Sequence, residues 1–331
     1  MSAANRQIVL AELPAGPLEA RHFREVEAPM PVARDGELLC RTLFASPDPV
    51  NRAQMRGRTY RDGLQAGDVM AGFTLSEVVS GDGLTAGTIV SCEAGWQEYA
   101  ALPLASLLPL AVEGPLSHHM SVLGISGLAA YFGLLEIGRP RAGETVVVSA
   151  AAGATGNVAA QLARIHGCRV VGITGTEEKR RVLEGDLRID ASVSHRSPTL
   201  AKDLRAACPD GIDVYFDNVG GPVLDACLPR MNRHGRVVCC GVLSQYDDDT
   251  PRPGPRAVPG LVISSRLRME GFVVLDFAAR WPEAREGLAG WVASGELQVL
   301  EEVDEGLAAA PGALVDVLAG RNVGKRIVRV A

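Results

Sequence analysis

The sequence predicts an α/β fold in which a doubly wound parallel sheet accompanies a smaller β-rich region. From about residue 120 onward, candidate strands alternate with helical segments, whereas the residues before it form short strands separated by turns. The chain has 331 residues, which is long for a single core and sufficient for two domains. We therefore expect two domains of different class.

The first region is predicted to be a compact β unit. Residues 37–44, 72–79 and 88–92 are rich in β-branched and apolar side chains and read as strands. Asp35-Gly36 and the Gly-Asp-Gly of residues 81–83 mark turns beside them. The end of the chain, residues 324–330, is again strand-like, and we expect it to return to this region.

The second region shows the alternation that a parallel sheet requires. A helical run covers residues 128–137, and a later helix carries Trp281 and Trp291. The candidate strands between and around these helices are residues 146–149, 169–173, 214–216, 236–240 and 268–275.

One strand–turn–helix segment carries the strongest functional signal. The β-branched run 145–148 stops at small residues, and Gly153 and Gly156 precede a helix. Glycines there allow close approach of a pyrophosphate, and the helix N-terminus presents unpaired N–H groups to the anion. The first glycine of the usual G-x-G-x-x-G pattern is Ala151. The pattern alone is weak, but a second strand arrives one helix later, as a dinucleotide-binding βαβ unit requires.

Composition excludes several classes of partner. The net charge of −6 argues against nucleic acid and anionic membrane surfaces, and no apolar stretch approaches the roughly 20 residues of a membrane span. The N-terminus lacks the apolar region of a secretion signal, so we expect a cytoplasmic protein with its seven scattered cysteines reduced. His118 and His119 are adjacent and have no Cys or Glu cluster beside them, so we expect no metal site.

Six blocks of sequence, in their order and spacing, resemble one known family. They are residues 128–135, 148–156, 215–221, 240–246, 271–274 and 320–325. Together they resemble the zinc-independent medium-chain dehydrogenase/reductase superfamily, and within it the prostaglandin reductase, leukotriene hydroxydehydrogenase and alkenal double-bond reductase group. The resemblance implies a GroES-like domain built from residues 1–119 and 299–331, with a Rossmann NADP-binding domain at 120–298. It also implies a homodimer, often joined by edge strands, which here would be residues 268–274.

The end of the second Rossmann strand favours NADPH over NADH. Sites that prefer NAD usually place an acid there for the ribose 2′-hydroxyl, and residues 172–176 contain none. Lys179 and Arg180 follow and can supply positive charge, although a solvated helix face is an equally good interpretation of the charge run 177–181. The family resemblance favours Lys179, because the matching lysine contacts the 2′-phosphate.

The resemblance also implies further cofactor contacts. Relatives commonly place an Asn-Tyr pair after the third strand, and the tyrosine contacts the 2′-phosphate; this chain has Ser194-His195. A protonated His195 can serve a phosphate, and it can equally be a plain surface residue. The other positions that would line the cofactor are Gly153, Ala154, Thr155, Gly156, Thr174, Asn218, Cys240, Tyr246, Phe272, Val274 and Asn322.

Tyr246 is the leading candidate for a catalytic group. Reduction of an activated alkene delivers hydride to the β-carbon of an enone or enal, and charge then develops on the carbonyl oxygen. A phenol stays protonated at neutral pH and can donate a hydrogen bond to that oxygen. Tyr246 follows a strand ending near Cys240, on the ligand side of the sheet; a tyrosine packed under the proline-rich loop 250–255 is the alternative.

Departures from the family pattern bear on the substrate. Val50 stands where relatives usually have tyrosine, and Ala129 stands where they have threonine, so two hydroxyls are lost from the expected pocket. Tyr60 is a candidate to fill the space beside Val50. We expect a bulkier or specialised α,β-unsaturated carbonyl substrate. A quinone oxidoreductase, and an NADPH-binding sensor with little catalysis, remain as alternative functions.

Overall fold

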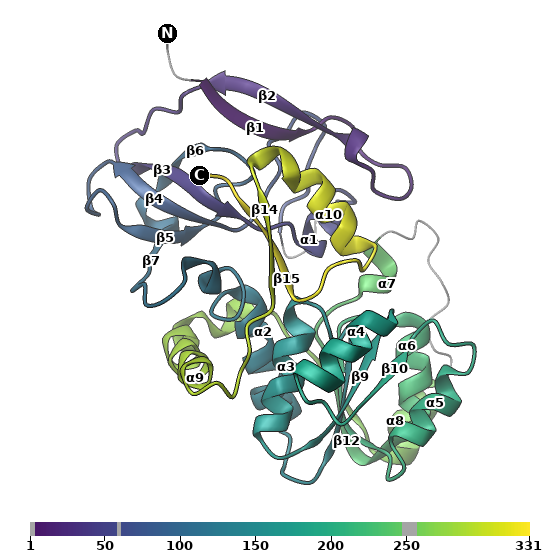
Figure 1. The fold of residues 1–331 in the computed structure, drawn as a ribbon. Helices are drawn as coiled ribbons and strands as arrows, with labels where there is room; N and C mark the ends of the chain where they lie inside the picture. The colour runs from purple at the N-terminus through teal and green to yellow at the C-terminus, as the bar shows by residue number, and fades with distance from the viewer. Residues whose placement is uncertain (1–3, 58–60, 247–256) are drawn as a thin grey trace. The chain divides into compact units, whose positions relative to one another are not determined.

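The structure is a computed structural model that describes residues 4–57, 61–246 and 257–331. The chain forms two compact units (Figure 1). The first comprises the described residues of Met1–Met120 with Glu302–Asn322 and Arg326–Ala331, and the second comprises Ser121–Glu301 with Val323–Lys325. The end of the chain therefore contributes to both units.

The first unit is built on antiparallel strands. Its seven-stranded sheet has the order β14-β15-β3-β4-β5-β7, with β6 paired to β3, and β1 and β2 form a separate ribbon. Every second residue of β3 is buried, as expected for a strand with one face on a core. The bounds are β1 Ala4–Leu10, β2 Phe23–Pro29, β3 Glu37–Ala45, β4 Thr74–Ser80, β5 Ile89–Cys92, β6 Tyr99–Pro103, β7 Leu108–Pro109, β14 Glu301–Glu305 and β15 Lys325–Arg329, with helices α1 Pro49–Gln54 and α10 Ala310–Leu318.

The second unit is a six-stranded parallel sheet with the order β10-β9-β8-β11-β12-β13. The strands are β8 Thr145–Ser149, β9 Arg169–Thr174, β10 Ala191–Ser194, β11 Ile212–Asp217, β12 Met231–Cys239 and β13 Arg268–Gly271. The helices are α2 Ile125–Phe132, α3 Ala154–Ile165, α4 Glu177–Arg181, α5 Leu200–Ala207, α6 Gly221–Cys227, α7 Leu243–Tyr246, α8 Val258–Ser265 and α9 Trp281–Ala293. This confirms the predicted doubly wound architecture.

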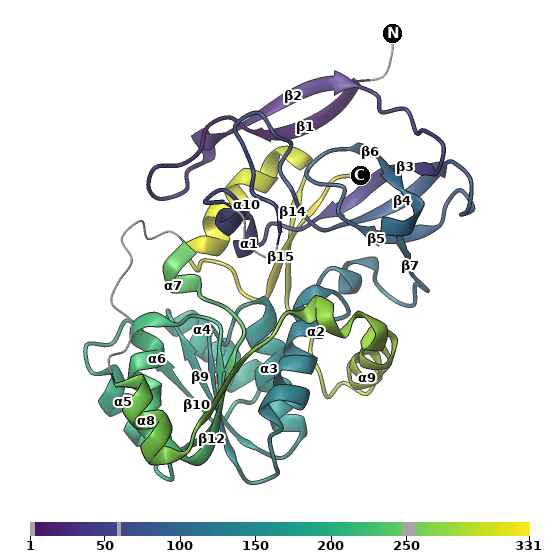
Figure 2. The ribbon, with the colours of Figure 1, turned by 180° about the vertical axis from the view of Figure 1, so that it is seen from behind.

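Helices cover both faces of this sheet because its strands are apolar on both sides. Val146 and Val148 of β8 join a core with α2, α3 and α9, whereas Val147 joins a second core with α5, α6 and α8. Figures 1 and 2 show α3 and α5 on opposite sides of the strands. Strands that are buried on both faces appear in the sequence as continuous apolar runs, and these runs made the strands predictable.

Two expectations about elements are corrected, and one strand was missing from the candidates. The strand expected over 268–275 ends at Gly271, because a 3₁₀ helix begins at Val274 and places Phe277 in stacking contact with Phe132, with ring centroids 4.6 Å apart. The helix expected over 128–137 begins at Ile125 and becomes a π-helical turn over Gly133–Gly138. The edge strand β10 was not among the candidates, since it is short and half of it is serine.

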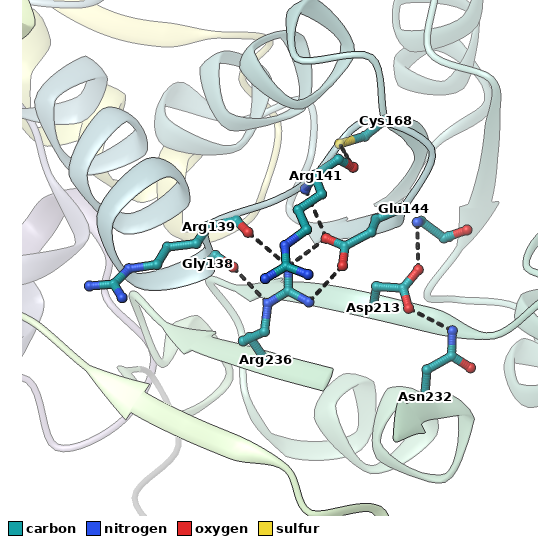
Figure 3. Close-up of polar contacts among 9 residues, drawn as sticks. Gly138, Arg139, Arg141, Glu144, Cys168, Asp213, Asn232 and Arg236 are labelled. Carbon is teal, nitrogen blue, oxygen red and sulfur yellow. Dashed lines mark hydrogen bonds and ion pairs between the residues drawn. The ribbon is translucent and has the colours of Figure 1, made fainter. Parts of the chain in front are cut away.

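Polar side chains join the amino-terminal ends of the central strands (Figure 3). Glu144 accepts two hydrogen bonds from Arg236, with Nη1–Oε1 and Nη2–Oε2 distances of 3.0 and 2.5 Å. Arg236 also donates to the carbonyl oxygens of Gly138 and Arg139, at 2.8 and 2.9 Å. The π-helical turn is thereby joined to β12 and to the residue that precedes β8.

Candidate functional site

The turn after β8 has the geometry of an anion-binding turn. Gly153 is the N-cap of α3, and its N–H donates to the carbonyl oxygen of Ala150 at 2.9 Å. A Cβ at Gly156 would lie 2.2 Å from that same oxygen, so only glycine permits the helix to start there. The predicted residues Gly153, Ala154, Thr155 and Gly156 thus lie together in the turn and the first turn of a twelve-residue helix.

Ala151, which replaces the usual first glycine, is accommodated by a glycine on the neighbouring strand. Ala151 is fully buried, and its N–H donates to the carbonyl oxygen of Ile173 at 3.0 Å. A Cβ at Gly172 of β9 would lie only 3.0 Å from the Ala151 Cβ. The methyl group therefore occupies space that a side chain at 172 would need, a compensation that the sequence motif does not reveal.

A segment near the chain terminus lies against this turn within the second unit. Gly324 pairs with Gly153 in a parallel bridge, and its N–H donates to the Ala152 carbonyl oxygen at 2.8 Å. A Cβ at Gly324 would lie 2.1 Å from the Leu300 carbonyl oxygen, so glycine is required. Asn322, predicted to contact the cofactor, is buried two residues before Gly324. Gly324 was predicted only as part of the block 320–325 and not as a site residue, although its positive φ of 71° is typical of glycine.

Thr174, Lys179 and His195 lie at the carboxyl ends of β9 and β10. Thr174 ends β9, and its carbonyl oxygen accepts a hydrogen bond from the His195 N–H at 2.9 Å. Lys179 occupies the first turn of α4, where its N–H is capped by the Thr176 hydroxyl at 3.3 Å, and its side chain is buried. These are the positions at which a Rossmann sheet meets the adenosine ribose.

Arg180 has a different environment from Lys179. Its guanidinium binds Glu177 at 3.0 Å and the Ser192 hydroxyl at 3.1 Å. Glu184 lies 3.9 Å away. Arg180 is therefore held within a network of side chains on its own helix and β10, which fits the solvated-face interpretation better than a ligand contact.

Asn218 is held by a buried network at the switch point between β8 and β11. Its N–H donates to the Ser149 hydroxyl at 2.9 Å, and its Nδ2 donates to the Ser149 carbonyl oxygen at 2.7 Å. The Asp217 carboxylate accepts bonds from the Tyr215 hydroxyl at 2.7 Å and from the N–H groups of Val219 and Gly220 at 3.0 and 2.9 Å. This network fixes the loop at the ligand edge of the sheet, and of its members only Asn218 was a predicted site residue.

Cys240, Phe272 and Val274 follow the last two strands. Burial, with the charge of Asp217 beside it, raises the pKa of the Cys240 thiol to about 12, so this thiol is not a nucleophile at neutral pH. A Cβ at Gly133 would lie 2.6 Å from Phe272 Cζ, so the Phe272 ring packs directly on the π-helical turn. Val274 begins the 3₁₀ helix, next to the ligand edge.

Tyr246 is carried by a short helix attached to the loop after β11. The N–H groups of Leu243 and Ser244 donate to the carbonyl oxygens of Asn218 and Val219 at 3.2 and 3.0 Å. The Ser244 hydroxyl also donates to Val219 O at 2.7 Å. Tyr246 ends α7 and is half-buried. Its position is therefore set by the same loop that holds Asn218.

The predicted pocket residues fall in different parts of the chain. Ala129 lies in α2 of the second unit and is half-buried. Val50 lies in α1 of the first unit and is half-buried. Tyr60 lies outside the described residues.

No three His, Cys, Asp or Glu side chains in the described ranges lie close enough together to hold a metal ion. Among the helices of those same ranges, none combines the length and the apolar character needed to cross a bilayer.

The comparisons with known proteins agree with this geometry. A family profile described as "N-terminal domain of oxidoreductase" matches residues 6–110, and one described as "Zinc-binding dehydrogenase" matches residues 154–290. The NADPH-dependent curcumin reductase of Escherichia coli is 38% identical, with 99% of this chain and 97% of the relative covered. The NADP(+)-dependent 2-alkenal reductase of Nicotiana tabacum is 35% identical, over 99% of this chain and 98% of the relative.

A solved structure extends the likeness to three dimensions. The crystal structure of CurA in complex with NADPH from Vibrio vulnificus superposes with a TM-score of 0.93 at 35% identity, covering 98% of this chain and 99% of that one. The similarity spans both domains and confirms the predicted family. The chain belongs to the medium-chain dehydrogenase/reductase superfamily, in the group of prostaglandin, curcumin and alkenal reductases.

Proposed function

We propose that this protein reduces the carbon–carbon double bond of an α,β-unsaturated carbonyl compound with NADPH. The observation that carries the proposal is the carboxyl edge of β9 and β10, where β9 ends in threonine and glycine without the usual acid, and a buried lysine and an exposed histidine follow the two strands. It occurs in a chain similar over nearly its whole length to NADPH-dependent curcumin reductase and 2-alkenal reductase. We place the enzyme in the cytoplasm.

The residues at the carboxyl edge of the second unit fit NADPH. The turn at Gly153–Gly156 presents backbone N–H groups at a helix N-terminus, which suits the pyrophosphate. Lys179 and His195 suit the 2′-phosphate, since an anion there meets cationic or neutral groups instead of a carboxylate. Asn218, Cys240, Phe272 and Val274 are assigned to the remaining length of the cofactor.

Tyr246 is assigned the stabilisation of charge on the substrate oxygen. Bound NADPH supplies a hydride to the β-carbon of the substrate. The carbonyl oxygen then gains negative charge, and the Tyr246 hydroxyl donates a hydrogen bond to it. The α-carbon finally takes a proton from a side chain or from water, and the enone becomes a saturated ketone.

The phenol assignment is tested by Tyr246→Phe. Loss of one hydrogen-bond donor to a developing oxyanion costs about 100-fold in rate, and the ribose hydroxyls of the cofactor share this role, so we expect kcat to fall by about tenfold to 100-fold. The KM for NADPH should change little. Tyr99→Phe, on β6 of the first unit, is the matched control. An unchanged kcat would remove Tyr246 from the mechanism.

Turnover of a substrate panel separates the alternatives. NADPH oxidation with enones should exceed that with quinones; faster turnover of quinones would identify a quinone oxidoreductase instead. NADPH binding without oxidation by any enone would indicate a sensor. Both outcomes are distinguishable from a failure to bind NADPH, which would reject the whole proposal.

We propose further that the substrate is bulky or specialised. Val50 and Ala129 carry no hydroxyl, so each supplies an apolar surface at a position predicted to line the pocket. Larger apolar enones should therefore give a higher kcat/KM than short alkenals. The reverse order would show that the two substitutions do not define substrate size.

We also propose a homodimer. Strand β13 is an edge of the six-stranded sheet, and an exposed sheet edge offers unpaired backbone groups to a second chain. Met269 on this strand and Ile263 on α8 are exposed, the latter by 75%. Light scattering should give twice the chain mass, and Met269→Glu should shift the equilibrium toward monomer.

A further inference from the structure

The carboxyl ends of β9 and β10 bring an ionisable ring next to two fixed cations. The strands run parallel with Ser194 opposite Thr174, so the residue after each strand lies at the same edge. A Cβ at Gly175 would lie 2.8 Å from His195 Cε1 and 3.5 Å from Arg196 Nε. The imidazole and the Arg196 guanidinium therefore both lie over the backbone of residue 175, with their side chains accessible to solvent.

Among the described residues, the charges that shift the pKa of His195 are those of two cations, Arg196 and Lys179. Burial of part of the ring lowers the pKa of His195 below its usual 6.5, and the charges of Arg196 and Lys179 lower it further. The hydrogen bond with Thr174 acts in the opposite direction and is weaker than these effects combined. At neutral pH the imidazole is consequently mostly neutral before an anion binds.

The carboxylates of the surrounding elements do not offset these cations. Glu177 of α4 is paired with Arg180, at 3.0 Å. Asp203 of α5 accepts hydrogen bonds from the hydroxyls of Ser197 and Thr199, at 2.5 and 3.1 Å. Glu178, the other acid of α4, is exposed. The end of β9 itself contributes only threonine and glycine.

We propose that binding of the 2′-phosphate is coupled to uptake of a proton by His195, which makes the preference for NADP over NAD dependent on pH. The inference rests on the proposed function and adds a thermodynamic property to its cofactor site. A phosphate dianion beside the ring favours imidazolium, which then donates a charge-assisted hydrogen bond to the phosphate. Lys179 contributes a second positive charge that acts on the same ring.

The direction of the pH dependence follows from linkage. Because the pKa of His195 is higher in the complex than in the free protein, the extra affinity is complete below the free-protein pKa. It is lost as the pH rises through the pKa of the complex. Above pH about 6 the phosphate itself stays largely dianionic, so the histidine dominates the change. NAD has no 2′-phosphate and should show no such dependence.

Calorimetry of NADP⁺ and NAD⁺ binding tests the coupling without relying on turnover. Titrations from about pH 6.5 to about pH 8.5, in buffers of different ionisation enthalpy, report affinity and proton uptake together. We expect NADP⁺ affinity to fall by about threefold to tenfold across this range, with net proton uptake near neutral pH, and NAD⁺ affinity to stay constant. NMR of the imidazole Cε1–H should show its titration moving to higher pH in the NADP⁺ complex.

Three variants distinguish the possible outcomes. His195→Gln should abolish proton uptake and flatten the pH profile, and His195→Tyr should give pH-independent NADP⁺ binding. Lys179→Met should weaken NADP⁺ at every pH but keep the proton uptake. Proton uptake that persists in His195→Gln, or equal pH profiles for NADP⁺ and NAD⁺ in the wild type, would overturn the inference. A wild-type protein that binds NADP⁺ no more tightly than NAD⁺ at any pH would instead contradict the proposed function.

Discussion

The two ends of the parallel sheet use charged residues in opposite ways. At the amino-terminal end, the Glu144 carboxylate and the Arg236 guanidinium meet in a two-bond pair, and Asp213 accepts bonds from Thr145 N–H and Asn232 at 2.8 Å each. At the carboxyl end of β9 and β10, the charges acting on His195 are cations. The charged groups at the amino-terminal end are paired within the protein, whereas the cations at the carboxyl end are stabilised when an anion binds beside them.

This difference separates what stabilises the fold from what binds a ligand. Pairing within the protein at the amino-terminal end contributes to the free energy of unfolding and leaves little capacity for a ligand. An excess of one sign at the carboxyl end costs stability and is offset when a phosphate binds. Substitutions at the two ends should therefore separate stability from cofactor affinity.

The largest effect is expected from Gly156→Ala, at the carboxyl end. The new Cβ would lie 2.2 Å from the Ala150 carbonyl oxygen, so the turn and the start of α3 must move apart. Displacement of a binding turn by about 1 Å is expected to lower kcat/KM for NADPH by about 100-fold. NADPH titration and circular dichroism would measure affinity and folding separately.

Two further glycines make this test specific. Gly153→Ala places its Cβ 3.1 Å from the same oxygen and should give an intermediate loss. Gly185→Ala meets no atom within 4 Å and is the matched control. If Gly156→Ala folds and binds NADPH as well as the control, this turn is not the pyrophosphate site.

The next largest effect, on thermal stability, is expected from Glu144→Gln at the amino-terminal end of the parallel sheet. Removing the charge weakens both bonds with Arg236, and charged hydrogen bonds in partly buried sites contribute about 2 kcal/mol. We expect a melting temperature lower by several degrees, with NADPH affinity unchanged within about twofold. A variant that loses affinity but not stability would contradict the comparison.

The same pair predicts an acid dependence. Burial raises the pKa of Glu144, but the bonds from Arg236 and the Arg141 N–H, with the Arg236 charge, lower it by more, so it lies below 4.5 in the folded protein. The stabilisation is thus complete above that value and is lost as the pH falls through the folded-state pKa. The difference in melting temperature between wild type and Glu144→Gln should shrink below pH about 4.

A smaller effect is expected from Lys179→Ala. The change removes one charge–phosphate contact, which corresponds to about tenfold in the KM for NADPH. The KM for NADH should stay nearly constant, because NADH has no phosphate there. Lys202→Ala, on α5, is the matched control. Equal changes for both cofactors would reject the assignment of Lys179.

The fold was largely predictable because the buried strands of the second unit are apolar on both faces and alternate with helices. Strand β10 was missed, since Ala191–Ser194 has neither the length nor the β-branched content of its neighbours. The predicted end of β13 was wrong because Phe277 packs on Phe132, and this contact joins residues far apart in sequence.

The candidate site was predictable only where one residue type is required locally. Gly153 and Gly156 are needed by the turn itself, so the motif identified them. The roles of Gly172, Gly324 and Asp217 depend on contacts with a neighbouring strand or a distant segment, so the local sequence does not predict them. The placement of His195 on Gly175 likewise depends on the pairing of β9 with β10.

The destination of the hydride tests the central claim most directly. An enone incubated with NADPH deuterated on either face of the nicotinamide C4 should yield a saturated ketone, with deuterium on the β-carbon from one of the two cofactors. Mass spectrometry and NMR of the product locate the label. An allylic alcohol with deuterium on the carbonyl carbon would contradict double-bond reduction.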